Sequence, residues 1–214
     1  MDGMVLMVAP ASEYDRRLVL LTKQCGRITA FARGARRQNS SLLGVTQPFV
    51  SGRFTLYPGR SAYSLVQVSV LESFSKLRED LLMSCYGSYF MELAMYYARE
   101  NLEATDMLNL LYVTLSAMEQ QLHDLPLIRA VYEIRLMTVN GEFPLEAEQN
   151  KTQQSAVRYA LAHAAAAPLG RLYAFRLTDE AADELIRISD QVRRRTIDRP
   201  LKSLEFLEVV AKNG

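Results

Sequence analysis

The spacing of apolar residues changes once along this chain, near residue 73, and the change separates two structural classes. Before that point lie five short strand-like runs: two apolar ones at residues 4–8 and 18–22, an alternating one at 27–32, and two more at 49–57 and 65–71. Turn residues such as Pro58 and Gly59 separate the runs, and no helical stretch between them is long enough for a crossover. Five short strands of this kind favour a small closed antiparallel barrel of the OB type over a parallel sheet.

From residue 73 onward, apolar residues recur with the 3.6-residue period of helices. Helices are expected at residues 86–97, 107–118, 127–136, 155–166, 179–195 and 201–211. Thr178 is expected to cap the fifth of these, and the polar segment 146–153 is predicted to be a loop. The predicted fold class is therefore α+β in two parts: a five-stranded barrel over residues 1–74, then an all-helical domain over residues 75–214 with a short loop near 141–152.

Charge is distributed unevenly between these two parts. Residues 1–71 carry nine basic and three acidic side chains, a balance of +6, whereas the remainder carries 16 basic and 21 acidic ones, a balance of −5. The small overall charge of +1 therefore conceals a basic N-terminal part. Such a part is suited to contact a polyanion, while the acidic remainder is not.

The most concentrated basic feature is the segment that follows the third predicted strand, which carries Arg33, Arg36 and Arg37 around Gly34. Guanidinium groups present planar forks of donors that match phosphate oxygens, so this segment is the first candidate for DNA binding. The alternative is a solvated turn. Other candidates on or beside the strands are Lys23, Arg27, Arg53, Arg60 and the stacking residues Tyr57, Phe31 and Tyr63.

One of these candidates has two possible orientations. Strand alternation places Phe31 on the face opposite Ile28, Ala30 and Ala32, so only one of the two sets can fill the barrel interior. The sequence does not decide which.

Several function classes lack their motifs here. The sequence contains no phosphate-binding GxxxxGK[ST] loop and no pattern typical of covalent catalysis, and Glu13 and Asp15 are the only close carboxylate pair in the basic part. No enzymatic activity and no cofactor are therefore predicted.

The expected location follows from other features of the sequence. The N-terminus does not resemble a secretory signal, and no run is long and apolar enough to span a membrane. Cys25 and Cys85 are far apart in sequence, so a cytoplasmic protein with reduced thiols is expected.

Several short segments, taken in order, resemble the RecO family of bacterial recombination mediators. They are residues 15–19 (Asp-Arg-Arg-Leu-Val), 32–37 (Ala-Arg-Gly-Ala-Arg-Arg), 47–49 (Gln-Pro-Phe), 72–74 (Glu-Ser-Phe), 132–136 (Tyr-Glu-Ile-Arg-Leu) and 199–207 (Arg-Pro-Leu-Lys-Ser-Leu-Glu-Phe-Leu). Each consists of common residues, but their agreement in order across both parts of the chain is specific. The resemblance covers most of the chain.

The resemblance implies a protein without catalytic turnover that binds single- and double-stranded DNA, anneals complementary strands and, with RecR, helps RecA replace single-strand binding protein (SSB). It implies a nucleoid-associated protein whose barrel binds DNA and whose helical part binds protein partners, including the acidic, hydrophobic-ended tail of SSB. Arg129, Arg135 and Leu136 are the candidates for this tail site. The alternative is that these arginines form intramolecular salt bridges. Arg193, Arg194 and Arg195 are interpreted as complements of a helix dipole and partners of Asp190 or Asp198, and a contact with DNA is the alternative.

One departure from the family concerns a metal. Many members carry a four-cysteine zinc knuckle after the central helix, whereas residues 141–152 of this chain contain no cysteine. His123 and His163 are also too far from the two cysteines in sequence to complete a local tetrahedral site, so no zinc is predicted.

A different class of function stays open at this point. A barrel-plus-helix adaptor without catalytic activity could use the same basic loop to bind RNA or an acidic protein surface. Charge alone does not distinguish it from a DNA-binding protein.

Overall fold

The computed structural model describes residues 1–213, and the side chains of residues 1–211. It contains two compact units, Met1–Tyr112 and Val113–Gly214, which are described separately below. The first unit therefore contains the whole strand region together with the first helices. The helix α3 (Thr105–Glu119) begins in the first unit and ends in the second.

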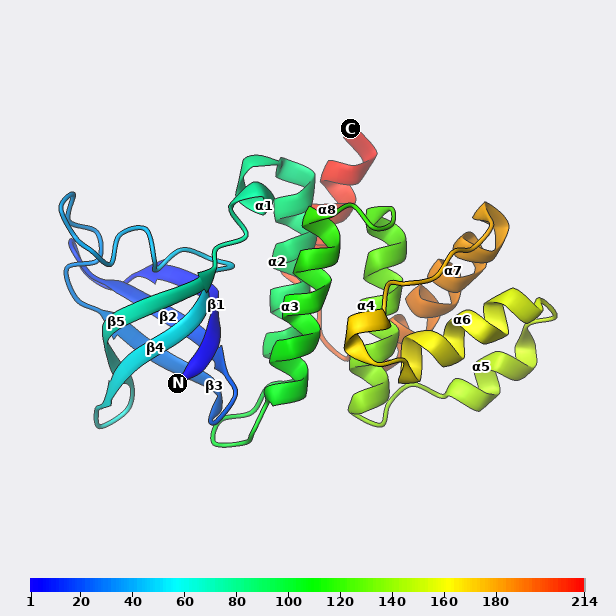
Figure 1. Cartoon of the computed structure of the whole chain (residues 1–214), viewed down its shortest axis with the longest axis horizontal. Helices are drawn as coiled ribbons and strands as arrows, with labels where there is room; N and C mark the ends of the chain where they lie inside the picture. Colours follow the sequence, from blue (N-terminus) through cyan, green and yellow to red (C-terminus); the bar gives the residue numbers. More distant parts are fainter. Residues whose placement is uncertain (214) are drawn as a thin grey trace. The chain divides into compact units, whose positions relative to one another are not determined.

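The five predicted strands are present and close into a barrel in the order β1-β2-β3-β5-β4 (Figure 1). They are β1 (Asp2–Pro10), β2 (Arg16–Thr22), β3 (Gly26–Ala32), β4 (Ser51–Pro58) and β5 (Tyr63–Glu72). This arrangement confirms the OB-like barrel. All pairings are antiparallel except the short one between β3 and β5. A closed ring of five strands cannot alternate in direction all the way round, so at least one parallel pair is required.

The barrel interior settles the orientation of β3. Ile28, Ala30 and Ala32 are buried in the barrel core with Leu20 of β2 and Phe54 of β4, whereas Phe31 is 37% exposed. The small alanines on β3 allow larger apolar residues from the neighbouring strands to fill the centre. Phe31 is therefore available on the outer surface.

Two helices follow the barrel within the first unit, α1 (Ser75–Glu79) and α2 (Leu81–Tyr97). Asp80 caps α2, because its carboxylate accepts a hydrogen bond of 2.8 Å from the backbone N–H of Met83. Tyr86, Tyr89, Phe90 and Tyr97 of α2 are buried, so these rings belong to the packed interior. At Gly87 a Cβ atom would lie 2.6 Å from the ring of Phe49, so glycine lets this buried ring approach the helix.

The turn between β2 and β3 is hydrogen-bonded to the connection between α2 and α3. The backbone N–H of Asn101 donates to the carbonyl of Cys25 at 3.0 Å, and that of Ala104 donates to the carbonyl of Lys23 at 2.9 Å. Arg27 reinforces the contact, since its backbone N–H donates to the carbonyl of Arg99 at 3.2 Å. These bonds hold the start of α3 against the barrel.

The second unit contains four of the predicted helices, α4 (Leu125–Val139), α6 (Ser155–Ala166), α7 (Asp179–Thr196) and α8 (Lys202–Asn213). It also contains α5 (Leu145–Lys151) and the 3-10 helix η1 (Leu169–Arg171). Thr178 caps α7 as predicted, with its hydroxyl accepting from the backbone N–H of Ala181. No helix among the described residues combines the length and apolar content needed to cross a bilayer.

The predicted loop at residues 146–153 is wrong, because most of this segment forms α5. Its sequence has almost no apolar periodicity, so hydrophobic spacing could not reveal the helix. Two other features stabilise it: Glu146 and Glu148 lie in its first turn, where they complement the helix dipole, and Lys151 lies in its last. Glu148 is also buried and forms an ion pair with Lys151 at 2.5 Å.

We predict that Gly26→Ala destabilises the protein by at least about 2 kcal/mol, because Gly26 has a positive φ of 61° and its Cβ would lie 2.1 Å from the carbonyl oxygen of Arg99. The urea midpoint of unfolding measures this loss. Gly44→Ala is the matched control, since its Cβ meets no atom within 4 Å, and we expect a change within about 0.5 kcal/mol. Equal midpoints for the two variants would contradict the close approach at Gly26.

Candidate nucleic-acid interface

The cationic segment after β3 is docked on the connection between β1 and β2. The backbone N–H of Gly34 donates to Oδ1 of Asp15 at 2.8 Å, and the backbone N–H of Arg36 donates to the carbonyl of Tyr14 at 2.9 Å. The guanidinium of Arg36 also donates to the carbonyl of Ser12 at 2.9 Å. The segment is therefore held in place by several bonds and is not a free turn.

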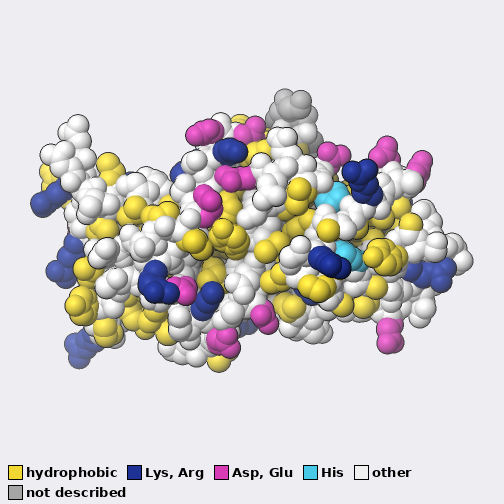
Figure 2. Space-filling model, in the orientation of Figure 1, with side chains coloured by type: hydrophobic (Ala, Val, Ile, Leu, Met, Phe, Trp, Pro, Cys, Tyr) yellow, Lys and Arg dark blue, Asp and Glu magenta, His cyan; other side chains and the backbone are white. Residues whose placement is uncertain are grey.

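The three arginines of this segment, Arg33, Arg36 and Arg37, are all exposed. The Arg37 guanidinium lies 5.1 Å from the centroid of the Tyr14 ring, within range of a cation–π interaction. The pKa of the Asp15 carboxyl lies below its usual value, mainly because the carboxylate accepts hydrogen bonds from Gly34 and Ser12. The positive charges of Arg33 and Arg37 lower this pKa by a smaller amount. Figure 2 shows dark-blue basic side chains projecting from the barrel at the left edge of the view.

A row of outward residues crosses four neighbouring strands next to this segment. In the strand registers Arg17 pairs with Phe31, Phe31 with Ser64, and Ser64 with Tyr57. Paired residues lie on the same face of a sheet, and three inter-strand steps span about 14 Å. Tyr57 is 65% exposed and Arg17 is also exposed, so the row offers one cation and two aromatic rings to solvent.

Two basic residues of the barrel form hydrogen bonds within the protein. The guanidinium of Arg27, a predicted DNA-binding residue, is half-buried and donates to the carbonyl of Met95 in α2 at 2.8 Å. Arg16 donates to the carbonyl of Leu43 at 2.8 Å and to the hydroxyl of Thr46 at 2.7 Å. These bonds direct both charged groups towards the protein.

The remaining predicted cations lie elsewhere on the barrel. Arg60 is exposed in the hairpin between β4 and β5. Lys23 and Arg53 line a cleft formed by β1, β4, β5 and the start of α3, hereafter the α3 cleft. Arg53 is exposed and forms an ion pair of 3.0 Å with Asp2.

The tail site predicted in the helical part consists of groups that already have internal contacts. The Arg129 side chain is 12% exposed and pairs with Asp190 at 3.0 Å and with the buried Glu133 at 3.7 Å. Arg135 donates to the carbonyl of Ala167, and Leu136 is fully buried. An SSB tail at these residues stays a prediction, and the observed contacts match the intramolecular alternative.

The arginine run at the end of α7 contributes to the same cluster. Arg193 is buried and pairs with Asp190 at 3.0 Å and with Glu133 at 3.4 Å. Ser189 donates to Glu133 at 2.6 Å. Arg194 and Arg195 are exposed in the last turn, where their charges complement the helix dipole.

Two residues of this interface, Arg17 and Tyr14, were absent from the predicted set. The charge of Arg17 could have indicated that it is exposed, but only the strand register places it opposite Phe31. No sequence signal pairs Tyr14 with Arg37, because the contact depends on how two loops fold together.

Cysteine and histidine side chains of the described residues are not grouped as metal ligands. The structure contains no cluster of three or more His, Cys, Asp or Glu side chains suited to a metal within that part of the chain. Cys25 and Cys85 are free thiols.

Comparison with known protein families matches both parts of the chain. The model described as "Recombination protein O N terminal" matches residues 1–74, and "Recombination protein O C terminal" matches residues 78–156. A DNA repair protein RecO from Symbiobacterium thermophilum is 33% identical, with an alignment that covers 98% of this chain and 96% of the relative. The chain belongs to the RecO family. The first match thus covers all five strands of the RecO-type barrel.

Two further relatives are consistent with this assignment to the RecO family. The DNA repair protein RecO of Alkaliphilus metalliredigens is 38% identical over 67% of this chain, and the alignment covers 58% of that relative. The DNA repair protein RecO of Clostridium novyi is 23% identical over 99% of this chain and 94% of its own length. Membership of the RecO family supports a role in DNA repair and recombination.

We predict that the triple substitution of Arg33, Arg36 and Arg37 by alanine lowers the salt dependence of single-strand binding. Each lost phosphate contact reduces the slope of log K against log salt by about 0.7, so the slope should fall by up to about 2. Fluorescence anisotropy with a labelled oligonucleotide at several salt concentrations measures it. Arg171, Arg176 and Arg187 are exposed in the second unit, and their triple alanine variant is the control of equal charge. An unchanged slope would exclude the loop from the interface.

We predict that Arg129→Ala lowers the free energy of unfolding by about 2–3 kcal/mol, because it removes one of the two cations that face the buried Glu133 carboxylate. Urea unfolding measures the change, and Arg187→Ala on the exposed side of α7 should stay within about 0.5 kcal/mol of the original protein. Unchanged stability together with lost binding of an SSB tail peptide would support the tail site.

Proposed function

We propose that this chain is a recombination mediator without catalytic turnover, which binds single- and double-stranded DNA without sequence preference and anneals complementary strands. The observation that carries the proposal is the outer surface of the barrel, where Arg33, Arg36 and Arg37 lie beside the row of Arg17, Phe31 and Tyr57. Membership of the RecO family supports the same role.

The chemistry of this surface suits annealing. Two complementary strands repel each other through their phosphates, and a cationic surface that contacts the backbones lowers this repulsion for both. Exposed aromatic rings stack on unpaired bases of any identity, so they hold single strands without selecting a sequence. Such a surface acts by binding energy alone and requires no nucleotide hydrolysis.

The proposal includes protein partners. The chain would act in the cytoplasm at the nucleoid, contact the SSB tail, and with RecR promote the loading of RecA onto SSB-coated single strands. The family relationship supports these partners.

We predict that the protein accelerates annealing of two complementary oligonucleotides, both naked and coated with the cognate SSB. Fluorescence quenching between end-labelled strands measures the rate. The triple arginine variant described above should lose most of the acceleration, while the control triple variant should retain it. Acceleration of naked strands only would remove the SSB contact from the proposal. Absence of acceleration in both cases would favour an adaptor for RNA or for an acidic protein.

A further inference from the structure

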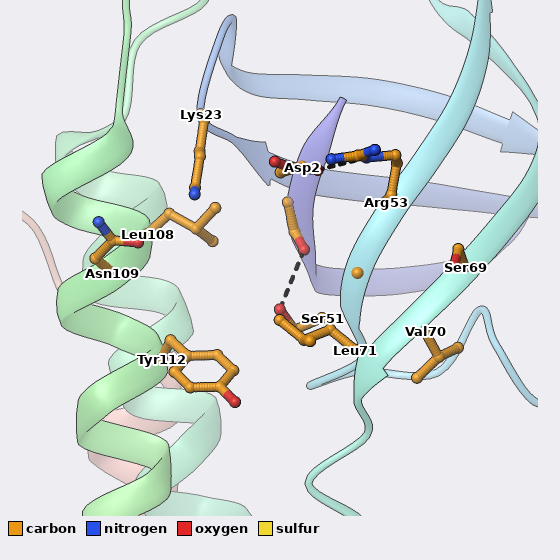
Figure 3. Close-up of a pocket in the computed structure, with 12 residues that line it drawn as sticks. Asp2, Lys23, Ser51, Arg53, Ser69, Val70, Leu71, Leu108, Asn109 and Tyr112 are labelled. Carbon is orange, nitrogen blue, oxygen red and sulfur yellow. Dashed lines mark hydrogen bonds and ion pairs between the residues drawn. The ribbon is translucent and has the colours of Figure 1, made fainter.

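The α3 cleft lies beside β4, which carries Arg53 and Tyr57 of the proposed DNA surface. Its volume is about 510 Å³, within the range of about 300–1,000 Å³ typical of small-molecule sites. One wall comes from the barrel and the other from Leu108, Asn109 and Tyr112 of α3, all within the first unit. Figure 3 shows Lys23 extending from the β2–β3 turn towards the cleft and the Tyr112 ring directed from α3 towards β4.

One end of the cleft is positively charged. The Asp2 carboxylate accepts a hydrogen bond from Arg53, and this bond is the main cause of the lowered pKa of Asp2. The charges of Arg53, Lys23 and the N-terminal ammonium lower this pKa further. The residues that line the cleft thus include two cations, Lys23 and Arg53, and one carboxylate, Asp2. This excess positive charge suits a phosphate group.

The rest of the cleft is suited to a flat ring with polar edges. Val70, Leu71 and Leu108 supply apolar surface, and Asn109 supplies an amide that can both donate and accept. The orientation of the Tyr112 ring is fixed by an edge contact with Phe74 at a centroid distance of 5.3 Å. A nucleobase has this combination of apolar faces and hydrogen-bonding edges.

The cleft is also continuous with the outer face of the barrel. Arg53, Thr55 and Tyr57 alternate along β4, and all three are exposed. From Arg53 to Tyr57 the strand rises about 13 Å, which corresponds to about four stacked nucleotides at about 3.4 Å each. A single strand on the aromatic row can therefore follow β4 to the cleft.

We propose that the α3 cleft receives one unstacked base of a single DNA strand, with its phosphate held by Lys23 and Arg53 and its ring placed against Tyr112. This inference rests on the proposed DNA-binding function and adds a base-accepting site to it. Bases in a duplex are paired and cannot enter, so the cleft contributes to single-strand binding only.

The test is photo-crosslinking of the whole protein to an oligonucleotide that carries 5-iodouracil, followed by mass spectrometry of the crosslinked peptides. We expect a crosslink at Tyr112. The variant Ser69→Trp fills the cleft from an exposed position on β5 without removing a charge, and Gln191→Trp places the same side chain on exposed α7 as a control. Ser69→Trp should abolish this crosslink and weaken single-strand binding about fivefold or more, with duplex affinity and salt slope unchanged.

The possible outcomes separate this inference from the proposed function. Crosslinks confined to the peptides of Phe31 and Tyr57 would keep DNA binding by the barrel and overturn the cleft proposal. Equal weakening of single-strand and duplex binding by Ser69→Trp would also overturn it. Protection of Tyr112 by an acidic peptide and not by DNA would assign the cleft to a protein partner instead. No crosslink and no DNA binding at all would refute the proposed function itself.

Discussion

The backbone contact between the β2–β3 turn and the α2–α3 connection fixes the start of α3 against the barrel. It joins Cys25 to Asn101 and Lys23 to Ala104 through hydrogen bonds of 3.0 and 2.9 Å. Two backbones can approach this closely only because Gly26 has no side chain. Since the contact fixes the start of α3, Tyr112 is held opposite the strands that carry Arg53, and the α3 cleft forms between them.

Burial divides the arginines of this protein into two groups with different roles. A charged group removed from water needs partners, so Arg16, Arg27 and Arg129 bind carbonyls or carboxylates of the protein itself. Exposed arginines keep their charge available to a ligand, and those after β3 are also kept in position by the bonds of the loop to residues 12–15. Composition counts both groups equally, although their burial differs.

Most strands and helices were predictable from their apolar residues. Elements such as β3 and α7 bury one face, which leaves a period of 2 or 3.6, whereas β1 and β2 are short apolar runs buried on both faces. Helix α5 was not predictable, because dipole complementation and the buried pair of Glu148 with Lys151 stabilise it without an apolar stripe. For the candidate site, the sequence indicated the cationic segment correctly as exposed. It could not assign Arg27 to a structural role, since the carbonyl that binds it is 68 residues away.

The sequence by itself determined the class of each part, the basic character of the barrel and the resemblance to the RecO family, because these depend on local periodicity, on charge and on the order of short motifs. Tertiary structure decided which face of β3 is interior, which arginines remain exposed, and that Lys23, Arg53 and Tyr112 line one cleft. These properties depend on strand register and on contacts between distant segments. The free energies of these contacts depend on burial and on pairing between residues that are distant in sequence. No local sequence pattern therefore predicts them.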